Sequence, residues 1–280
     1  MSRLDGCFAR LRAAGERALV VYFTAGDPSL EATRHLVAAA ARSGADVIEL
    51  GVPFSDPLAD GPVIQRAGNR ALAGGVTLAR VLETVALLRQ QVGVPIALFT
   101  YYNPVLAFGL KAFARTSAEA GVDGVIVVDL PPEEADPLAA EATPAGLDLI
   151  HLVAPTSTAA RVRMIARRSR GFVYMVTVTG VTGERREVAP EIAAQIRTLR
   201  LVTTKPICVG FGIARPEQVA AVGRLADGVI VGSAIVRKVE ECAGKPDMVE
   251  DVGRFIAALK APLKNMGGAT HPKPPPHTRV

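Results

Sequence analysis

The feature of this sequence that most constrains its fold is a regular alternation of short apolar runs with longer amphipathic segments. Short apolar runs bounded by Gly and Pro predict strands, and amphipathic segments predict helices. The predicted strands cover residues 18–28, 47–50, 95–101, 124–129, 147–153, 171–177, 206–210 and 228–231. The predicted helices cover residues 30–44, 62–73, 77–91, 109–120, 132–142, 158–169, 189–200, 215–224 and 247–263, with a short additional helix from 233.

Eight strands, each followed by a helix through a short loop, favour a single (β/α)8 TIM barrel, a fold that commonly takes about 250 residues. Residues 3–14 carry apolar side chains at a helical spacing and predict an extra N-terminal helix. The alternative is an open doubly wound sheet, but no G-x-G-x-x-G sequence follows the first predicted strand. We expect residues 1–266 to form the barrel and the Pro-rich tail, 267–280, to be disordered.

The amino-acid composition disfavours membrane proteins, metal-binding cysteine clusters and nucleic-acid-binding proteins. No apolar run reaches 18 residues, so no membrane span is predicted, and the N-terminal residues mix acids with bases, which favours a cytoplasmic protein. The three cysteines have no metal-like spacing. Of the net charge of +5, two charges lie in the tail at Lys273 and Arg279, and the remaining +3 is scattered. No basic stripe carries aromatic residues, so nucleic acid is not expected as a partner. A small anionic molecule is the better match.

Residues 47–62, VIELGVPFSDPLADGP, place several acids around the end of the second strand. The two-residue period of a strand puts Val47 and Glu49 on one face and Ile48 and Leu50 on the other. A carboxylate in a strand buried on both sides must be paired, protonated or used in chemistry. Structural ion pairing remains the alternative for Glu49, and a role in a turn is the alternative for Asp60.

Glycines follow three successive strands, at Gly180–Gly183, Gly210–Gly212 and Gly232–Ser233. Glycine lets backbone N–H groups approach an anion closely, and the free N–H groups at a helix N-terminus attract negative charge. Each glycine alone is ordinary turn chemistry. Together they predict a phosphate site, because the loops after the last strands commonly bind phosphate in this fold.

Across the predicted barrel mouth lie Glu49, Asp60, Tyr101 and Asp129. Two carboxyl groups in environments of different polarity can divide the work of acid and base. His35 lies in a predicted helix and His151 in a predicted strand with apolar neighbours, so we expect a structural role for each. No lysine stands at the end of a predicted strand, which disfavours Schiff-base chemistry. No cluster of metal ligands is predicted.

The strings ELGVPFSDPLADGP, YYNPV, DLPPEE, LVAPTS, TGVTG, GFGI and GSAIV follow successive strands in this order. With them the sequence resembles the α subunit of tryptophan synthase over about residues 4–266. The resemblance implies a lyase that cleaves indole-3-glycerol phosphate by a retro-aldol reaction into indole and glyceraldehyde 3-phosphate. It implies that Glu49 is the general acid and base at indole C3 and the glycerol hydroxyl, that Asp60 contacts the indole N–H, and that residues 184–188 form a mobile lid.

The resemblance also implies the remaining site residues. The residues expected to bind substrate are Tyr22, Phe99, Tyr101, Ile126, Asp129, Leu152, Tyr174, Thr182 and Phe211. Those expected to hold the phosphate are Gly183, Gly212, Gly232 and Ser233. No metal or cofactor is implied for this chain, since pyridoxal phosphate would belong to a partner β subunit in an α2β2 complex that receives indole directly.

Three other functions fit a phosphate-binding barrel. An indole-3-glycerol phosphate synthase or an isomerase of the same pathway type is the nearest, but the synthase is expected to carry a lysine at a strand end. A metal-dependent epimerase is expected to carry His and Asp ligands there. A non-catalytic barrel that binds a phosphate ligand and regulates a partner would have no need of both Glu49 and Asp60.

Overall fold

The computed structural model describes residues 1–177, 190–210 and 212–267. Its strands in this part of the chain are β1 (Ala18–Thr24), β2 (Val47–Gly51), β3 (Ile96–Thr100), β4 (Gly124–Val127), β5 (Asp148–Ile150), β6 (Leu152–Val153), β7 (Val173–Val176), β8 (Ile207–Gly210) and β9 (Gly228–Val231). Its α-helices are α1 (Arg3–Ala13), α2 (Leu30–Arg42), α3 (Pro62–Ala73), α4 (Leu78–Leu88), α5 (Tyr102–Phe108), α6 (Leu110–Ala120), α7 (Asp136–Ala142), α8 (Ala159–Arg168), α9 (Pro190–Arg200), α10 (Pro216–Gly223), α11 (Ser233–Cys242) and α12 (Met248–Lys260), followed by the short 3-10 helix η1 (Ala261–Leu263).

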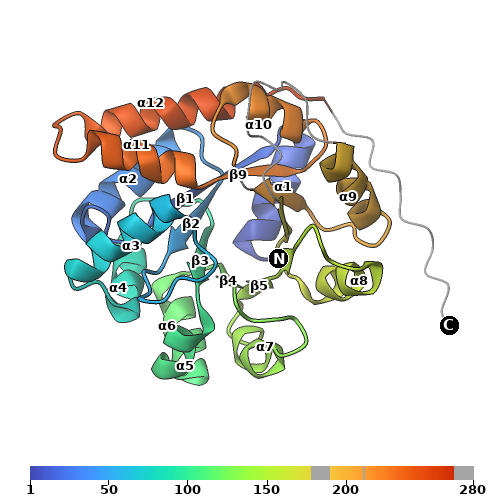
Figure 1. The fold of residues 1–280 in the computed structure, drawn as a ribbon, viewed down its shortest axis with the longest axis horizontal. Helices are drawn as coiled ribbons and strands as arrows, with labels where there is room; N and C mark the ends of the chain where they lie inside the picture. The colour runs from blue at the N-terminus through green and yellow to red at the C-terminus, as the bar shows by residue number, and fades with distance from the viewer. Residues whose placement is uncertain (178–189, 211, 268–280) are drawn as a thin grey trace.

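The strands form one parallel sheet in the order β5-β4-β3-β2-β1-β9-β8-β7-β6. The two end strands are separated in sequence only by His151, so the sheet curls until its ends meet, and the helices surround it (Figure 1). This arrangement confirms the predicted TIM barrel with an extra N-terminal helix.

The predicted strand 147–153 is two short strands, because its first half pairs with β4 and its second half with β7. At the break, the N–H of His151 donates to Ser169 Oγ at 3.2 Å, and its carbonyl accepts from the N–H of Tyr174 at 3.2 Å. Burial lowers the pKa of the His151 imidazole to about 4. The ring is therefore neutral at pH 7, as expected for a structural histidine.

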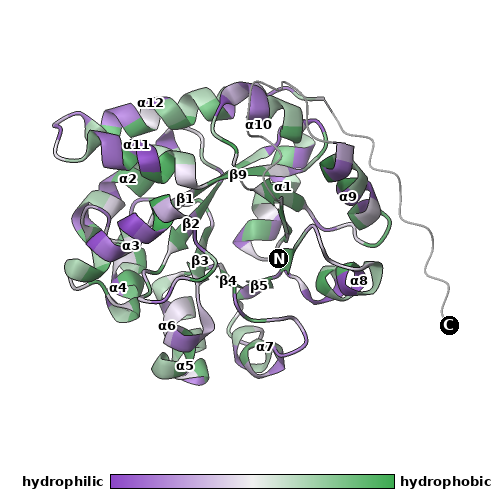
Figure 2. Ribbon diagram, viewed as in Figure 1, coloured by the Kyte–Doolittle hydropathy of each residue, from purple (hydrophilic) through white to green (hydrophobic). Residues whose placement is uncertain are grey.

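Alternate residues of each strand face two separate apolar layers. Val47 packs inside the barrel with Val20 and Ala97, whereas Ile48 and Leu50 belong to the larger core between the sheet and the helices. The predicted two-residue period of β2 is confirmed. Apolar colour dominates the central strands, whereas the surrounding helices carry both colours, as amphipathic helices should (Figure 2).

Helix α1 closes the end of the barrel where the strands begin. Its buried face consists of Leu4, Cys7, Phe8 and Leu11, which join the interior layer of the barrel. The ring of Phe8 lies 5.8 Å from that of Phe172, which stands just before β7. The Ser2 hydroxyl accepts from the N–H of Asp5 and so fixes where the helix begins. The barrel interior is thus filled at this end.

Two helices differ from prediction. Helix α5 lies where a loop was expected: Pro104 falls in its first turn, where a missing N–H costs no intrahelical hydrogen bond. Helix α7 begins at Asp136 rather than 132, after the two prolines of the preceding loop. No single helix in the described ranges is long and apolar enough to cross a membrane. Helices α3 and α4, which are bent by 95° relative to each other, reach that length and apolar composition only when they are taken together.

Candidate active site

A cavity of about 260 Å³ opens at the carboxyl ends of the strands. It includes eight of the side chains and glycines named from the sequence, together with parts of the loop after β2 and of helices α3 and α11. Its lining residues are Tyr22, Glu49, Ala59, Asp60, Gly61, Pro62, Val63, Ile64, Phe99, Tyr174, Gly212, Ile230, Gly232, Ser233 and Arg237. Glu49, Asp60 and the Gly232–Ser233 corner therefore face one space.

Glu49 lies on the inner face of β2 and is only 1% exposed. Its neighbours in register are Tyr22 on β1 and Ala97 on β3, and its Oε1 has no hydrogen-bond partner among the described residues. Burial raises the pKa of this carboxyl group to about 8, since the charged form loses its hydration without gaining a cation. At pH 7 Glu49 is mainly a neutral acid that faces the cavity. Structural ion pairing, the alternative for this residue, is excluded within the described part of the chain.

Two tyrosines stand beside Glu49 on the inner wall. Tyr22 packs edge-on against Phe99, with ring centroids 5.5 Å apart, and Tyr174 lies on β7. A Cβ atom at Gly51 would stand 2.1 Å from the Tyr22 hydroxyl, and one at Gly210 would stand 2.9 Å from the Tyr174 hydroxyl. Glycine at these two strand ends therefore makes room for the rings. Burial raises the pKa of both tyrosines well above 10, so both hydroxyls remain protonated.

Asp60 is held in a wetter place by Tyr101. The Tyr101 hydroxyl donates to Asp60 Oδ2 at 3.0 Å and accepts from the N–H of Ala59 at 3.0 Å. Burial raises the pKa of Asp60, and the hydrogen bond from Tyr101 opposes that shift. Tyr101 itself packs against Phe54 at 5.1 Å and does not line the cavity. Its position suits a residue that orients Asp60.

The predicted phosphate corner is built by backbone. Gly232 precedes the first turn of α11, whose leading N–H groups have no intrahelical acceptor. Gly212 has φ +71°, a conformation that favours glycine, and a Cβ there would meet nothing within 4 Å. Thr182, Gly183 and Phe211, the lid at 184–188 and the tail from 268 lie outside the described residues.

Besides Tyr101, three predicted substrate residues do not line this cavity. Ile126 is fully buried in the barrel interior, and Leu152 packs partly buried beside it. The Asp129 carboxylate accepts from the N–H of Tyr102 at 2.7 Å, at the start of α5. Helix α5 had not been predicted, so this capping role could not be expected from the sequence.

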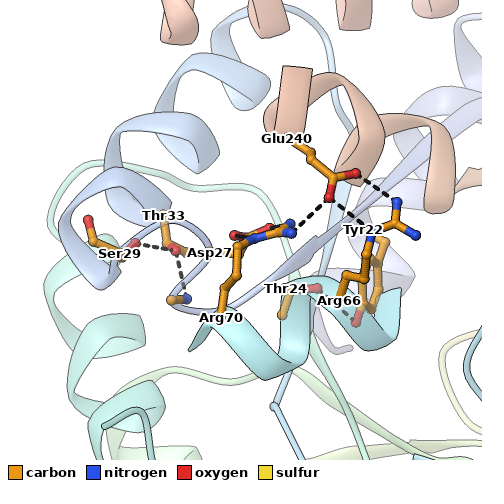
Figure 3. Close-up of polar contacts among 9 residues, drawn as sticks. Tyr22, Thr24, Asp27, Ser29, Thr33, Arg66, Arg70 and Glu240 are labelled. Atoms are coloured by element: carbon orange, nitrogen blue, oxygen red, sulfur yellow. Dashed lines mark hydrogen bonds and ion pairs between the residues drawn. The ribbon is translucent and has the colours of Figure 1, made fainter. Parts of the chain in front are cut away.

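An ionic network behind the cavity joins three segments that are distant in sequence (Figure 3). Arg70 of α3 grips Asp27, after β1, through two hydrogen bonds of 2.8 and 2.9 Å, and donates a third to Glu240 of α11 at 2.8 Å. Arg66 donates two more to Glu240 at 3.1 and 2.9 Å. These bonds hold the pKa of Glu240 at about 2. The network fixes α3 against α11 one to two turns behind the residues that line the cavity.

Sequence reasoning missed the apolar residues Ile64 and Ile230 and the cation Arg237. Ile64 follows the loop of Asp60 by one helical turn, and Ile230 faces inward two positions before Gly232. Arg237 follows Ser233 by four positions on α11, so its spacing places both on one face of that helix. That spacing was the available signal.

The fold and the cavity together define a class of protein: a (β/α)8 barrel whose mouth has a buried acid on one side and a glycine-rich corner on the other. Residues 8–264 match the sequence model of the family described as tryptophan synthase alpha chain. The chain belongs to the tryptophan synthase alpha chain family.

Individual relatives agree with this assignment. The tryptophan synthase alpha chain of Geobacter sp. (strain M21) is 51% identical over 93% of this chain and 97% of its own. That of Geobacter sulfurreducens is 50% identical over 95% and 100%. The crystal structure of the alpha chain from Legionella pneumophila superposes with a TM-score of 0.87 at 39% identity, covering 96% of this chain and all of the other. A chain of tryptophan synthase from M. tuberculosis superposes with a TM-score of 0.85 at 36% identity, covering 94% and 98%.

Proposed function

We propose that this chain cleaves indole-3-glycerol phosphate to indole and glyceraldehyde 3-phosphate as a carbon–carbon lyase of tryptophan biosynthesis. The observation that carries the proposal is Glu49, a buried carboxyl group that faces the cavity, is mainly neutral at pH 7 and has no hydrogen-bond partner for its Oε1 among the described residues. Cleavage of the bond between indole C3 and the glycerol chain requires protonation of C3, and a neutral carboxylic acid can supply that proton.

Two carboxyl groups are sufficient for the proposed reaction: Glu49 transfers the protons and Asp60 stabilises the developing charge. Glu49 gives its proton to C3, and the positive charge that develops on the indole nitrogen is stabilised by Asp60, which accepts a hydrogen bond from the ring N–H. The carboxylate of Glu49 then takes the proton from the glycerol hydroxyl next to the breaking bond. The bond breaks, its electrons return to the ring, and glyceraldehyde 3-phosphate leaves as the aldehyde with Glu49 protonated again.

We assign the phosphate to the backbone of Gly212 and Gly232 and to Ser233, with Gly183 as a fourth expected contact. The free N–H groups at the start of α11 support this assignment, because helix N-termini bind anions. The indole ring would lie against Tyr22, Phe99 and Tyr174, whose rings line the same cavity. Thr182, Phe211, Ile126, Leu152 and Asp129 remain expected contacts or supports.

The proposed reaction moves only protons and one electron pair within the substrate. It needs no oxidant, and the protonated indole ring itself accepts the electron pair of the breaking bond, so we expect no metal or organic cofactor in this chain. Pyridoxal phosphate is expected only in a partner β subunit. We also propose a cytoplasmic location, which is supported by Cys7, Cys208 and Cys242 being buried and unpaired, as in reducing compartments.

We propose that the partner is a β subunit in an α2β2 complex that receives indole at the barrel mouth. The family name, alpha chain, implies a second kind of chain. The loop before Asp60 supports the mouth as the docking place, because Leu58 is 96% exposed there and Pro57 limits its unfolded freedom. Docking would order the loop that carries Asp60 and so raise turnover.

Indole release from indole-3-glycerol phosphate tests the proposed activity. Glu49→Gln preserves shape but cannot transfer a proton, so kcat should fall about 10²–10⁴-fold or more. Asp60→Asn should lose less activity, because an amide oxygen can still accept from the indole N–H. Glu119→Gln is the matched control, since its side chain is 68% exposed on α6 and should not affect turnover. A Glu49→Gln variant with more than about a tenth of the wild-type kcat would remove Glu49 from the chemistry.

The partner is tested separately with a cognate β subunit. The β subunit should bind the wild-type chain and stimulate cleavage, and Leu58→Asp should weaken both effects while leaving the activity of the isolated chain unchanged. Leu106→Asp, at a second exposed leucine on α5, is the control for a new surface charge. Equal stimulation of wild type and Leu58→Asp would refute docking through this loop but would leave Glu49 as the proposed acid.

A further inference from the structure

The described part of the cavity wall contains one cationic side chain, and the proposed phosphate assignment does not use it. Among the described residues that line the cavity, Arg237 is the only Lys or Arg, while Glu49 and Asp60 are acids. Backbone N–H groups at Gly212 and Gly232 offer partial charges only. Among the described lining residues, a phosphate dianion that enters this space therefore has one full positive charge available to it, on α11.

The helix geometry directs Arg237 toward the predicted phosphate corner. Arg237 stands four positions after Ser233, one turn further along the same face of α11. Long side chains in helices lean toward the N-terminus, over the preceding turn. This preference would bring the guanidinium of the exposed Arg237 back toward Ser233 and Gly232, and all three residues line the same cavity.

The ionic network of Figure 3 explains why Arg237 is free. Glu240 is three positions after Arg237, a spacing at which acid and base commonly pair on a helix. Here both oxygens of Glu240 are occupied by Arg66 and Arg70 of α3. Glu241, four positions after Arg237, forms no ion pair with it either, and Arg237 has no hydrogen-bond or ion-pair partner in the described part of the chain.

We propose that Arg237 is a side-chain ligand of the substrate's phosphate group, kept available because α3 occupies its natural partner Glu240. The proposal rests on the proposed function, since the anion is the phosphate of the indole-glycerol substrate. A planar guanidinium can donate two parallel hydrogen bonds to phosphate oxygens, which adds orientation to charge. Arg237 binds the part of the substrate that does not react, so it contributes to binding rather than to the chemical step.

The test compares Arg237→Gln with Lys238→Gln, which removes the same charge from the next residue of α11, outside the cavity lining. Hydrogen bonds to charged groups predict a rise of about tenfold in KM for Arg237→Gln, with kcat within about twofold of wild type. Inhibition by glycerol 3-phosphate should weaken by the same factor, whereas inhibition by uncharged indole should not change. Lys238→Gln should match wild type in all four values.

Arg237→Lys keeps the charge with fewer donors and should give an intermediate KM, which also covers the case in which the Gln variant does not fold. If the wild-type chain cleaves the substrate and both Arg237 variants retain its KM and its inhibition by glycerol 3-phosphate, the proposal is overturned. Equal losses in Arg237→Gln and Lys238→Gln would also overturn it, because they would indicate a general charge effect. If the wild-type chain releases no indole, the proposed function fails, and the affinity for glycerol 3-phosphate still decides the role of Arg237.

Discussion

Replacing Glu49 with Gln should make the folded protein more stable at high pH while removing its activity. The pKa of Glu49 is raised from 4.5 to about 8 by burial. Between these two pH values the folded chain retains a proton that the unfolded chain has lost. The folded state therefore binds more protons, and its free energy of unfolding falls as pH rises through this window. Gln does not titrate, so the variant escapes that loss.

The magnitude follows from the shift. One pH unit in this window is worth about 1.4 kcal/mol, and the effect ends as the folded-state pKa is passed. Between pH 6 and pH 9 the wild type should lose about 2 to 3 kcal/mol relative to Glu49→Gln. The comparison of two chains at each pH cancels every other titrating group, and the fixed cost of a buried amide cancels between the two pH values.

Equilibrium urea denaturation of both chains at pH 6, 7, 8 and 9 measures this difference, provided that the m value is the same for both. Glu119→Gln, at an exposed acid on α6, is the control and should show no trend relative to wild type. A difference between Glu49→Gln and wild type that stays constant within about 0.5 kcal/mol from pH 6 to pH 9 would refute the reasoning, because Glu49 would then ionise in the folded chain as readily as in water.

Three further outcomes follow from the same geometry. If Glu49 begins the reaction protonated, kcat/KM should fall with a slope of one proton as pH rises through about 8, and a profile flat to pH 9 would contradict this. Gly51→Ala should lower the free energy of unfolding in urea by about 1 to 3 kcal/mol, because its Cβ would overlap Tyr22, whereas Gly68→Ala on α3, with open space, should not destabilise the chain. Tyr101→Phe should lower kcat/KM about tenfold through loss of the hydrogen bond that orients Asp60, and an unchanged value would refute that positioning role.

Most of the barrel could be predicted because its signals are local. Strand β2 is an apolar run with a period of two, and this pattern is visible in its own residues. The glycines at 210, 212 and 232 likewise indicate the ends of strands without any knowledge of neighbouring segments. Glu49 could be selected in the same way, since an acid inside an apolar strand is anomalous in the sequence itself.

The remaining features depend on segments that meet only in the folded chain. The break at His151 reflects pairing with two different neighbours, and nothing within residues 147–153 indicates it. The bonds of Arg70 to Asp27 and Glu240 join residues separated by 43 and 170 positions. The space that a side chain at Gly51 would need is occupied by the ring of Tyr22, which comes from another strand. Whether a side chain lines the cavity or supports it, as with Arg237 and Tyr101, is decided by such contacts.

The helix that fills the start of the barrel also determines how material can pass through the site. Because α1 seats Leu4, Phe8 and Leu11 inside the ring, the described side chains fill the end of the barrel opposite the mouth. With that end filled, the substrate and both products of the proposed reaction would enter and leave through the mouth, and a protein docked there would control both steps. A β subunit docked at the mouth would then receive indole without a separate exit channel in this chain, because indole would leave the site at the docking surface.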